Sequence, residues 1–300
     1  MIDTLVGHHR TRSVLSTLSL YLRLTKPRVV ELLLVITVPP MILAAGSIPR
    51  ASLVLFVLAG GALAAGGANT LNCWIERDRD LAMARTASRP LPARLIEPRR
   101  ALLFGLTLEV AAFALLWSTV NLLAAVLAVG AMLFYVFVYT IWLKPRSTQN
   151  IVIGGAAGAV PVLVGWAAVT GTLAAPAWTM FAIVFLWTPP HFWALALRYR
   201  DDYAAAGFPM LPVTNGVKAA TTQILGYACA VFVASLLLVV VAETGILYLA
   251  AAVALGVAFV TAAAVLHREP TAQRGLRFFR FSNIYLALLF VAVAADTLAS

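Results

Sequence analysis

Nine long apolar runs dominate this chain. They cover residues 29–48, 51–72, 101–119, 121–143, 151–171, 177–197, 223–242, 245–266 and 281–299. Each is close to the roughly 20 residues that a helix needs to cross a bilayer, and none shows the short alternating segments of a transmembrane β-barrel. Charged residues make up only 11% of the chain, whereas soluble domains carry roughly 25%. We therefore predict an all-α, multi-pass membrane protein with nine transmembrane helices.

The basic residues are distributed very unevenly between the two sides of such a bundle. If the N-terminus and every second loop share one side, that side holds every Lys and Arg except Arg50, out of 22. The positive-inside rule then predicts a cytoplasmic N-terminus and an outside C-terminus, in the cell's inner (plasma) membrane. The mitochondrial inner membrane is the alternative. The net charge of +10 follows from this distribution, so it does not indicate nucleic-acid binding.

The organisation along the chain is simple. We expect residues 1–22 to form a cytoplasmic N-terminal segment and residues 23–300 to form a single transmembrane domain, with long charged loops at 73–100 and 198–222 on the cytoplasmic side. The first 28 residues lack the apolar core of a signal peptide, which favours an amphipathic surface segment over a transit peptide. The two cysteines, Cys73 and Cys229, form no CxxC pair and indicate no disulfide framework or metal site.

A charged cluster directly follows the second apolar run. The stretch NCWIERDRDLAMART, residues 72–86, contains three acids and three arginines. If the helix continues past Leu71, the side chains of Asn72, Glu76 and Asp80 fall on one face and Asp78 points elsewhere. Such oxygen ligands suit Mg²⁺, which proteins hold through one or two carboxylates together with substrate phosphates. A solvated loop with surface ion pairs is the alternative, but polar groups that begin inside an apolar helix are usually functional. We therefore predict a metal site.

A second polar stretch follows the sixth run, FLWTPPHFWALALRYRDDYAAAGFPMLP at 185–212. On a continuous helix, His191, Arg198 and Asp202 recur at i, i+7 and i+11 and form one stripe. Functional and purely structural roles for His191 are equally open at this point. Pro189 and Pro190 are expected to kink or end the sixth helix just before it.

Further polar and small residues bear on the same region. Lys26, Arg28, Lys144 and Arg146 would lie on the same side as both acidic stretches, so an anion and a divalent cation could meet there. Glu109, in the middle of the third run, is either a buried hydrogen-bonded residue or part of a cavity. Glycines in the second and fifth runs predict close helix packing; these are Gly60, Gly61, Gly66, Gly67, Gly154, Gly155 and Gly158.

These motifs resemble those of the UbiA-type intramembrane prenyltransferases. The stretch from Asn72 is similar to the Asn-x3-Asp-x3-Asp motif of that family, with Glu76 in place of the first Asp. Its continuation with Met83, Arg85, Thr86, Arg89 and Pro90 has the form seen in the protoheme IX farnesyltransferase (haem O synthase) branch. LTKPR (24–28), YTIWLK (139–144), QNIVIGGAAGA (149–159), the 188–212 string and FSNIYLALLFVAVAAD near the end are also similar to that branch. A second pair of acids spaced by four residues is incomplete, because Leu197 and Arg198 precede Asp201 and Asp202.

The resemblance implies a nine-helix bundle with a central cavity open toward the cytoplasmic side and toward lipid. It implies transfer of a farnesyl group from farnesyl diphosphate to a vinyl group of haem B, giving haem O and diphosphate on the pathway to haem A for terminal oxidases. Mg²⁺ would be held by Asn72, Glu76 and Asp80. The expected catalytic set is these three residues with His191 and Asp202, and the expected substrate-binding set is Lys26, Arg28, Arg85, Arg89, Tyr139, Lys144, Arg146 and Arg198.

The expected partners are farnesyl diphosphate, haem B, membrane lipids, and the haem A synthase or the oxidase assembly machinery. Two alternatives stay open. One is a UbiA-type enzyme with an aromatic or quinone-precursor acceptor. The other is a membrane transporter, although transporters more often place their charges near mid-span, whereas these acids lie at helix ends.

Overall fold

The computed structural model describes residues 14–300, and within this range the chain is entirely helical, with no strand. The first helix is α1 (Val14–Thr25). Most of the expected N-terminal segment, residues 1–22, therefore lies outside the described residues.

The nine apolar runs form nine membrane-spanning helices within the described range, so the predicted fold class is confirmed. The spans are α2 (Pro27–Ala45), α3 (Ala51–Asp80), α4 (Pro98–Thr119), α5 (Leu122–Leu133) continued by the π-helix η1 (Phe134–Leu143), α6 (Asn150–Thr170), α7 (Ala175–Arg198), α10 (Gly216–Val241), α11 (Ile246–Arg268) and α12 (Ala272–Ala299). Two short helices, α8 (Arg200–Ala205) and α9 (Leu211–Thr214), lie between α7 and α10.

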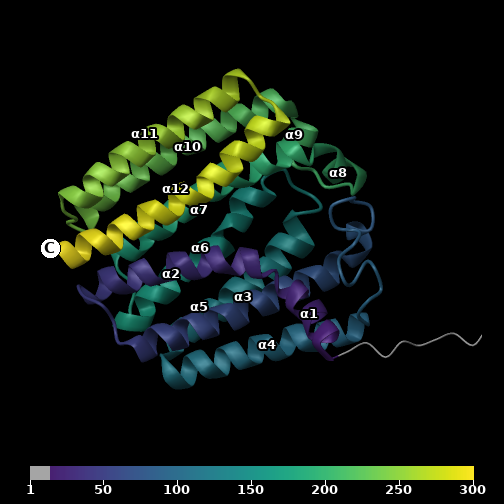
Figure 1. Ribbon diagram of the computed structural model, residues 1–300, viewed down its shortest axis with the longest axis horizontal. Coiled ribbons are helices and arrows are strands. Elements are labelled where there is room, and N and C mark those ends of the chain that lie inside the picture. The colour runs from purple at the N-terminus through teal and green to yellow at the C-terminus, as the bar shows by residue number, and fades with distance from the viewer. Residues whose placement is uncertain (1–13) are drawn as a thin grey trace, which may run out of the picture.

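The helices pack in two groups. In one group α3 lies along α4, with α5 beside α6; in the other, α10 packs against both α7 and α11, and α12 packs on α7 and α11 (Figure 1). Contacts of α2 with α6 and α12, and of α6 with α7, join the groups. The C-terminus lies at the end opposite α8 and α9 (Figure 1). The chain therefore builds one continuous bundle, with α8 and α9 at one end and the C-terminus at the other.

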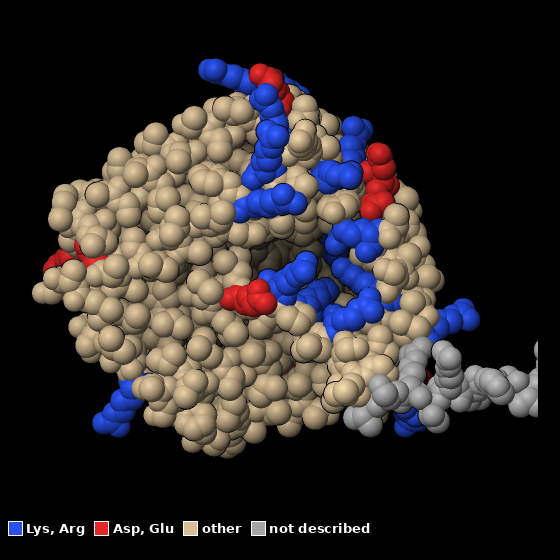
Figure 2. All heavy atoms as spheres, viewed as in Figure 1, with Lys and Arg blue, Asp and Glu red and all other residues tan. Residues whose placement is uncertain are grey.

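Charge is concentrated at one of these ends. Figure 2 shows most Lys and Arg side chains at the end that carries α8 and α9, and a hollow in the viewed face bordered by basic side chains. Arg50, the N-cap of α3, lies at the other end. The uneven distribution of basic residues between the loops predicted such a concentration of charge at one end of the bundle.

Glycines allow the close helix contacts that the sequence predicted. A Cβ on Gly60 would lie 2.5 Å from the Leu116 side chain, and one on Gly67 would lie 2.6 Å from Glu109 Oε1. These positions bring α3 against α4 without space for a methyl group. Gly158 differs, because a Cβ there would meet nothing within 4 Å. Glu109 thus lies in the α3–α4 interface.

The two prolines of α7 do not end that helix. It runs unbroken from Ala175 to Arg198, with Pro189 and Pro190 buried inside it. Each proline removes one backbone N–H, but packing of α7 against α6, α10 and α12 holds the helical path. Of the two outcomes expected from these prolines, a kink or a helix end before His191, the helix end was wrong.

Candidate active site

Three polar side chains line the charged end of α3. The helix continues nine residues beyond Leu71, to Asp80, and the loop 81–97 covers one side of its last turn, because Arg89 pairs with Asp80 and Thr86 Oγ1 donates to Asp80 O. Asn72, Glu76 and Asp80 are all buried, and the side chain of Asp80 is essentially inaccessible. Asp78 points outward: its side chain is 81% exposed and pairs with Arg77 at 3.7 Å. The helix therefore presents one buried, oxygen-rich face, as its four-residue spacing predicted.

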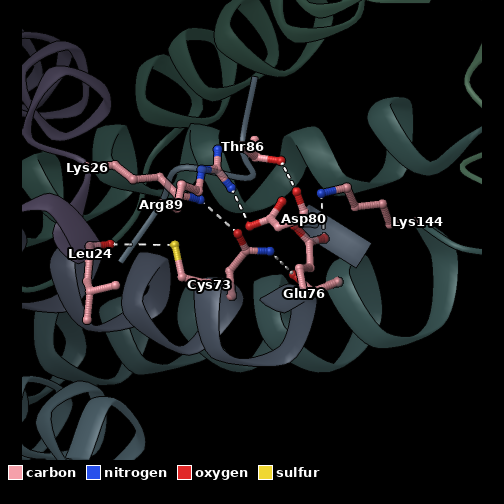
Figure 3. Close-up of polar contacts among 10 residues, drawn as sticks. Leu24, Lys26, Cys73, Glu76, Asp80, Thr86, Arg89 and Lys144 are labelled. Carbon is pink, nitrogen blue, oxygen red and sulfur yellow. Dashed lines mark hydrogen bonds and ion pairs between the residues drawn. The ribbon is translucent and has the colours of Figure 1, made fainter. Parts of the chain in front are cut away.

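Each of these three residues has a basic partner from a different part of the chain, and Figure 3 shows those of Glu76 and Asp80. Lys26, between α1 and α2, donates from Nζ to Asn72 Oδ1 at 2.7 Å. Lys144, directly after η1, forms an ion pair with Glu76 Oε1. Arg89 Nη1 lies 2.8 Å from Asp80 Oδ2. Three cations thus converge on two carboxylates and an amide, which leaves the cluster with a surplus of positive charge.

Burial and pairing act in opposite directions on these cations. Burial lowers the pKa of Lys26, because an ammonium loses hydration when it leaves water. Burial alone would also lower the pKa of Lys144, but the charge of Glu76 and the hydrogen bond to it outweigh this, and the pKa is raised. Lys144 therefore keeps its proton while it is paired with Glu76.

The acid face fits a divalent cation. Asp80 Oδ1 is buried and has no hydrogen-bond partner among the described residues, although Oδ2 is paired with Arg89. A buried carboxylate oxygen without a donor is costly. A hard cation satisfies such an atom, and carboxylate and amide oxygens are its preferred ligands. Asn72, Glu76 and Asp80 are the residues that would hold it.

The π-helix η1 was not anticipated from the sequence, which indicated one regular span over 121–143. In η1, Thr140 donates to Tyr135 O at 2.8 Å and accepts a hydrogen bond from Asn72 Nδ2 at 3.1 Å. The backbone N–H of Lys144 bonds to Tyr139 O, five residues back. π-helical turns are rare and often occur at functional sites. Here the wider turn directs both Thr140 and Lys144 at α3, so Thr140 joins the site although its side chain gave no sequence signal.

Aromatic rings cover the basic groups. Lys144 Nζ lies 4.8 Å from the centre of the Phe208 ring and 5.7 Å from that of Tyr139, and the guanidinium of Arg79 lies 5.2 Å from Phe208. Tyr139, which the sequence assigned to the site, is buried against Gly154. Phe208, from the 185–212 stretch, was not predicted individually, and it closes the site from the α8–α9 side.

The stripe predicted for the 185–212 stretch does not form. The helix ends at Arg198, where Tyr199 adopts φ −112° and ψ 29°, and α8 then starts in a new direction. Arg85, Arg198, Asp201 and Asp202 line a surface hollow of about 400 Å³ around Tyr199. His191 instead packs inside the bundle between Trp187 and Phe279. The break at Tyr199 therefore separates Asp202 from His191, whereas Arg198 stays on the same helix as His191, two turns later.

Two other predicted residues lie outside the cluster. Arg146 is exposed, and its Nη1 donates to the carbonyls of Ile141 and Trp142 at the end of its own helix, at 2.8 and 3.1 Å. Arg28 is exposed in the first turn of α2. The structure brings Lys26, Arg89 and Lys144 to the acid face but does not bring Arg28 or Arg146 there.

Comparison with known proteins is consistent with this arrangement. The sequence profile described as the UbiA prenyltransferase family matches residues 32–288. The chain belongs to this family. Among curated relatives, protoheme IX farnesyltransferase 1 of Saccharopolyspora erythraea is 54% identical over 93% of this chain and 90% of its own length. Protoheme IX farnesyltransferases of Mycobacterium tuberculosis and Trichormus variabilis are 51% and 49% identical over 96% and 99% of this chain, and each match covers 94% of the relative.

Solved UbiA structures share the fold. A structure of digeranylgeranylglyceryl phosphate synthase aligns with a TM-score of 0.77 at 19% identity, over 95% of this chain and all of that one. A UbiA homologue from Archaeoglobus fulgidus bound to GPP and Mg²⁺ aligns with a TM-score of 0.64 at 16% identity, over 91% and 99% of the two chains. Membership of the UbiA family identifies the protein as an integral membrane prenyltransferase, and the predicted family is thereby confirmed.

Proposed function

We propose that this UbiA prenyltransferase transfers the farnesyl group of farnesyl diphosphate to a vinyl carbon of haem B, giving haem O and diphosphate for the pathway to haem A. The observation that carries the proposal is about 50% identity, over nearly the whole chain, to proteins named protoheme IX farnesyltransferase. The basic and acidic groups gathered at the end of α3 support it, because a prenyl diphosphate needs both.

In the proposed site, Lys26, Arg89 and Lys144 bind the diphosphate. Arg85 and Arg198, which line the surface hollow around Tyr199, attract the anionic substrate toward this site. Asn72, Glu76 and Asp80 hold Mg²⁺, which supplies Lewis-acid neutralisation of the diphosphate. In the structure each acid or amide is paired with one of these cations. The side chains are therefore already positioned, and substrate binding exchanges partners rather than creating a charged cluster from disorder.

The reaction breaks the bond between farnesyl C1 and oxygen, with the electron pair leaving on diphosphate. Lysine and arginine donors stabilise this leaving group, and the rings of Tyr139 and Phe208 offer π faces to the developing allylic cation. The vinyl π electrons form the new carbon–carbon bond. Water then adds to the resulting cation and loses a proton, which leaves a hydroxyl group. A buried, aromatic site keeps water from the farnesyl cation before the bond forms.

We place the charged end of the bundle at the cytoplasmic face of the inner membrane, with the C-terminus outside, because every Lys and Arg but Arg50 falls in the N-terminal segment or in a loop on one side of the nine-span arrangement. Residues 23–300 then form one transmembrane domain, whose loops 73–100 and 198–222 carry the site. Reporter fusions at Ser300 and within loop 73–100 test this orientation. Alkaline phosphatase, which is active only outside, should be active at Ser300 and inactive in the loop.

The function is tested by analysing haem from membranes of cells that overproduce the chain. Haem heavier by one farnesyl group and one water supports the proposal, and unchanged haem B beside a prenylated aromatic or quinone precursor refutes it. The variant Asp80→Asn should reduce turnover by on the order of a hundredfold, as expected for the loss of one electrostatic stabiliser. Asp78→Asn is the matched control, because that exposed carboxylate lies on the same helix but points away from the site. Chelation should abolish turnover and added Mg²⁺ should restore it.

A further inference from the structure

The imidazole of His191 is clamped on both faces. The ring of Trp187, one turn earlier in α7, stacks on it with centroids 4.2 Å apart and planes at 21°. The ring of Phe279, from α12, stacks on the opposite face at 4.3 Å and 28°. Trp187 is itself fixed by a hydrogen bond from its Nε1 to Ser282 O at 3.0 Å. With both faces covered, only the nitrogen-bearing edge of the imidazole can bind a ligand.

Ser282 determines which nitrogen carries the proton. His191 Nδ1 lies 2.6 Å from Ser282 Oγ, and the hydroxyl of Ser282 donates its single hydrogen to Phe279 O at 2.7 Å. Because that hydrogen is used, Ser282 Oγ accepts the bond, and Nδ1 of His191 is the donor. The neutral ring therefore presents the lone pair of Nε2.

Nε2 is available to a ligand. Among the described residues it forms no hydrogen bond, and it is not one of the fully enclosed polar atoms; the side chain is only partly buried. A histidine with one nitrogen donating to a protein oxygen and the other carrying an open lone pair has the arrangement of a metal ligand, because the outer hydrogen bond fixes both tautomer and orientation.

The helical turn that carries His191 packs on the same segment of α6 as η1 does. Thr188, one turn before it, packs against Gly155, where a Cβ would lie 3.0 Å from the threonine. The adjacent Gly154 packs against Tyr139, whose ring lies 5.7 Å from Lys144 Nζ. A path through α7, α6 and η1 thus joins the turn that carries His191 to the cation that pairs with Glu76.

We infer that His191 Nε2 is an axial ligand to the iron of the porphyrin acceptor, with Ser282 as its positioning residue. The inference rests on the proposed function for the identity of the acceptor. One coordination bond fixes the iron at the nitrogen-bearing edge of the His191 imidazole. The vinyl groups of the porphyrin are then limited to positions reached by rotation about that bond. Ligation therefore orients the vinyl carbon for attack, and it distinguishes metalloporphyrin from a metal-free acceptor of similar size.

The test is a titration of the purified full-length protein in detergent with haem B, without farnesyl diphosphate, followed by absorption and resonance Raman spectroscopy. The wild type should show an iron–histidine stretch in the ferrous state. His191→Ala should lose it, and added imidazole should restore a ligated spectrum to a correctly folded variant. Ser282→Ala should keep the ligand but shift the stretch to lower frequency and weaken haem binding by on the order of tenfold, the scale of losing an outer hydrogen bond to a metal-ligating histidine.

The control is His267→Ala, which removes a histidine that bonds to Lys218 and Thr221 away from this cluster and should leave the spectrum unchanged. An unchanged spectrum in His191→Ala, or no iron–histidine stretch in the wild type, overturns the inference. Farnesylated haem from a wild type without that stretch would leave the proposed function intact and remove only the ligation. Failure of both haem product and haem binding would reject the proposed function itself.

Discussion

Lys144 and Glu76 form a buried ion pair between the end of the π-helix η1 and the last turns of α3, with side chains 11% and 5% exposed. The pair joins two helices that the chain separates by 68 residues. Removing one member of such a pair leaves an uncompensated buried charge, which is more destabilising than removing both. The pair is therefore both a structural link and, in the proposed mechanism, part of the diphosphate site.

We expect Lys144→Met to lower the free energy of unfolding by about 3 kcal/mol, because Glu76 is left charged and unpaired. The double variant Lys144→Met/Glu76→Gln should recover much of this stability but no activity. Thermal unfolding in detergent and farnesyl transfer measure the two effects. Arg274→Met is the control, because its pair with Glu269 is more exposed, at 33% and 65%, and should change stability by less than about 1 kcal/mol. Equal effects of Lys144→Met and Arg274→Met would contradict the argument.

Thr140→Val should weaken catalysis more than folding. Valine keeps the shape of the side chain but removes the oxygen that accepts from Asn72 Nδ2, so the amide loses its fixed orientation toward Lys26. We expect roughly a tenfold loss of turnover and a stability loss of about 1 kcal/mol, the usual contribution of one hydrogen bond. Thr107→Val is the comparison, since its hydroxyl bonds only to Leu103 O in its own helix. Full activity of Thr140→Val would show that Asn72 needs no such support.

Asp296 should matter for stability and little for chemistry. At the end of the bundle far from the acid face, its carboxylate accepts from Gly245 N at 2.6 Å and Tyr248 N at 3.0 Å, and so caps the start of α11. Asp296→Ala should cost about 1–2 kcal/mol, the scale of losing an N-cap, while turnover of the folded fraction stays near wild type. Thr297→Ala, which loses only a bond within α12, is the matched control. A turnover defect in Asp296→Ala at full stability would point to a role beyond capping.

The fold was predictable because hydrophobic run length and loop charge are local properties. Nine runs gave nine spans, and the four-residue spacing of Asn72, Glu76 and Asp80 gave the acid face as soon as α3 continued past Leu71. Helix ends set by tertiary packing were not predictable. Pro189 and Pro190 are accommodated because neighbouring helices enclose α7. The helix ends at Arg198, and neither Arg198 nor the following Tyr199 is a proline or glycine that would have signalled the end.

The partners of each polar side chain were equally hidden in the sequence. The sequence assigned five basic residues to the site, because all five are cationic and belong to segments on the same side of the predicted bundle. They are Lys26, Arg28, Arg89, Lys144 and Arg146. Only the three-dimensional path of the chain separates them: the wider turn of η1 directs Lys144 inward, whereas Arg146, two residues later, reaches back to its own helix end. The hydrogen bonds of Thr140 with Asn72 and of Ser282 with His191 likewise depend on residues that are 68 and 91 positions apart in the sequence.

Two glycines of α6 provide a final test of how the site is supported. A Cβ on Gly154 would lie 2.3 Å from the Tyr139 ring, whereas one on Gly158, a turn later, would meet nothing within 4 Å. Gly154→Ala should therefore displace Tyr139 and the π-helical turn, costing about 1–3 kcal/mol of stability, as for overpacked cores, and lowering turnover through Lys144. Gly158→Ala should be neutral or stabilising by up to about 1 kcal/mol, because alanine is the better helix former. Thermal unfolding and turnover of the two variants, measured side by side, decide the matter; similar behaviour would mean that Tyr139 is not held against α6.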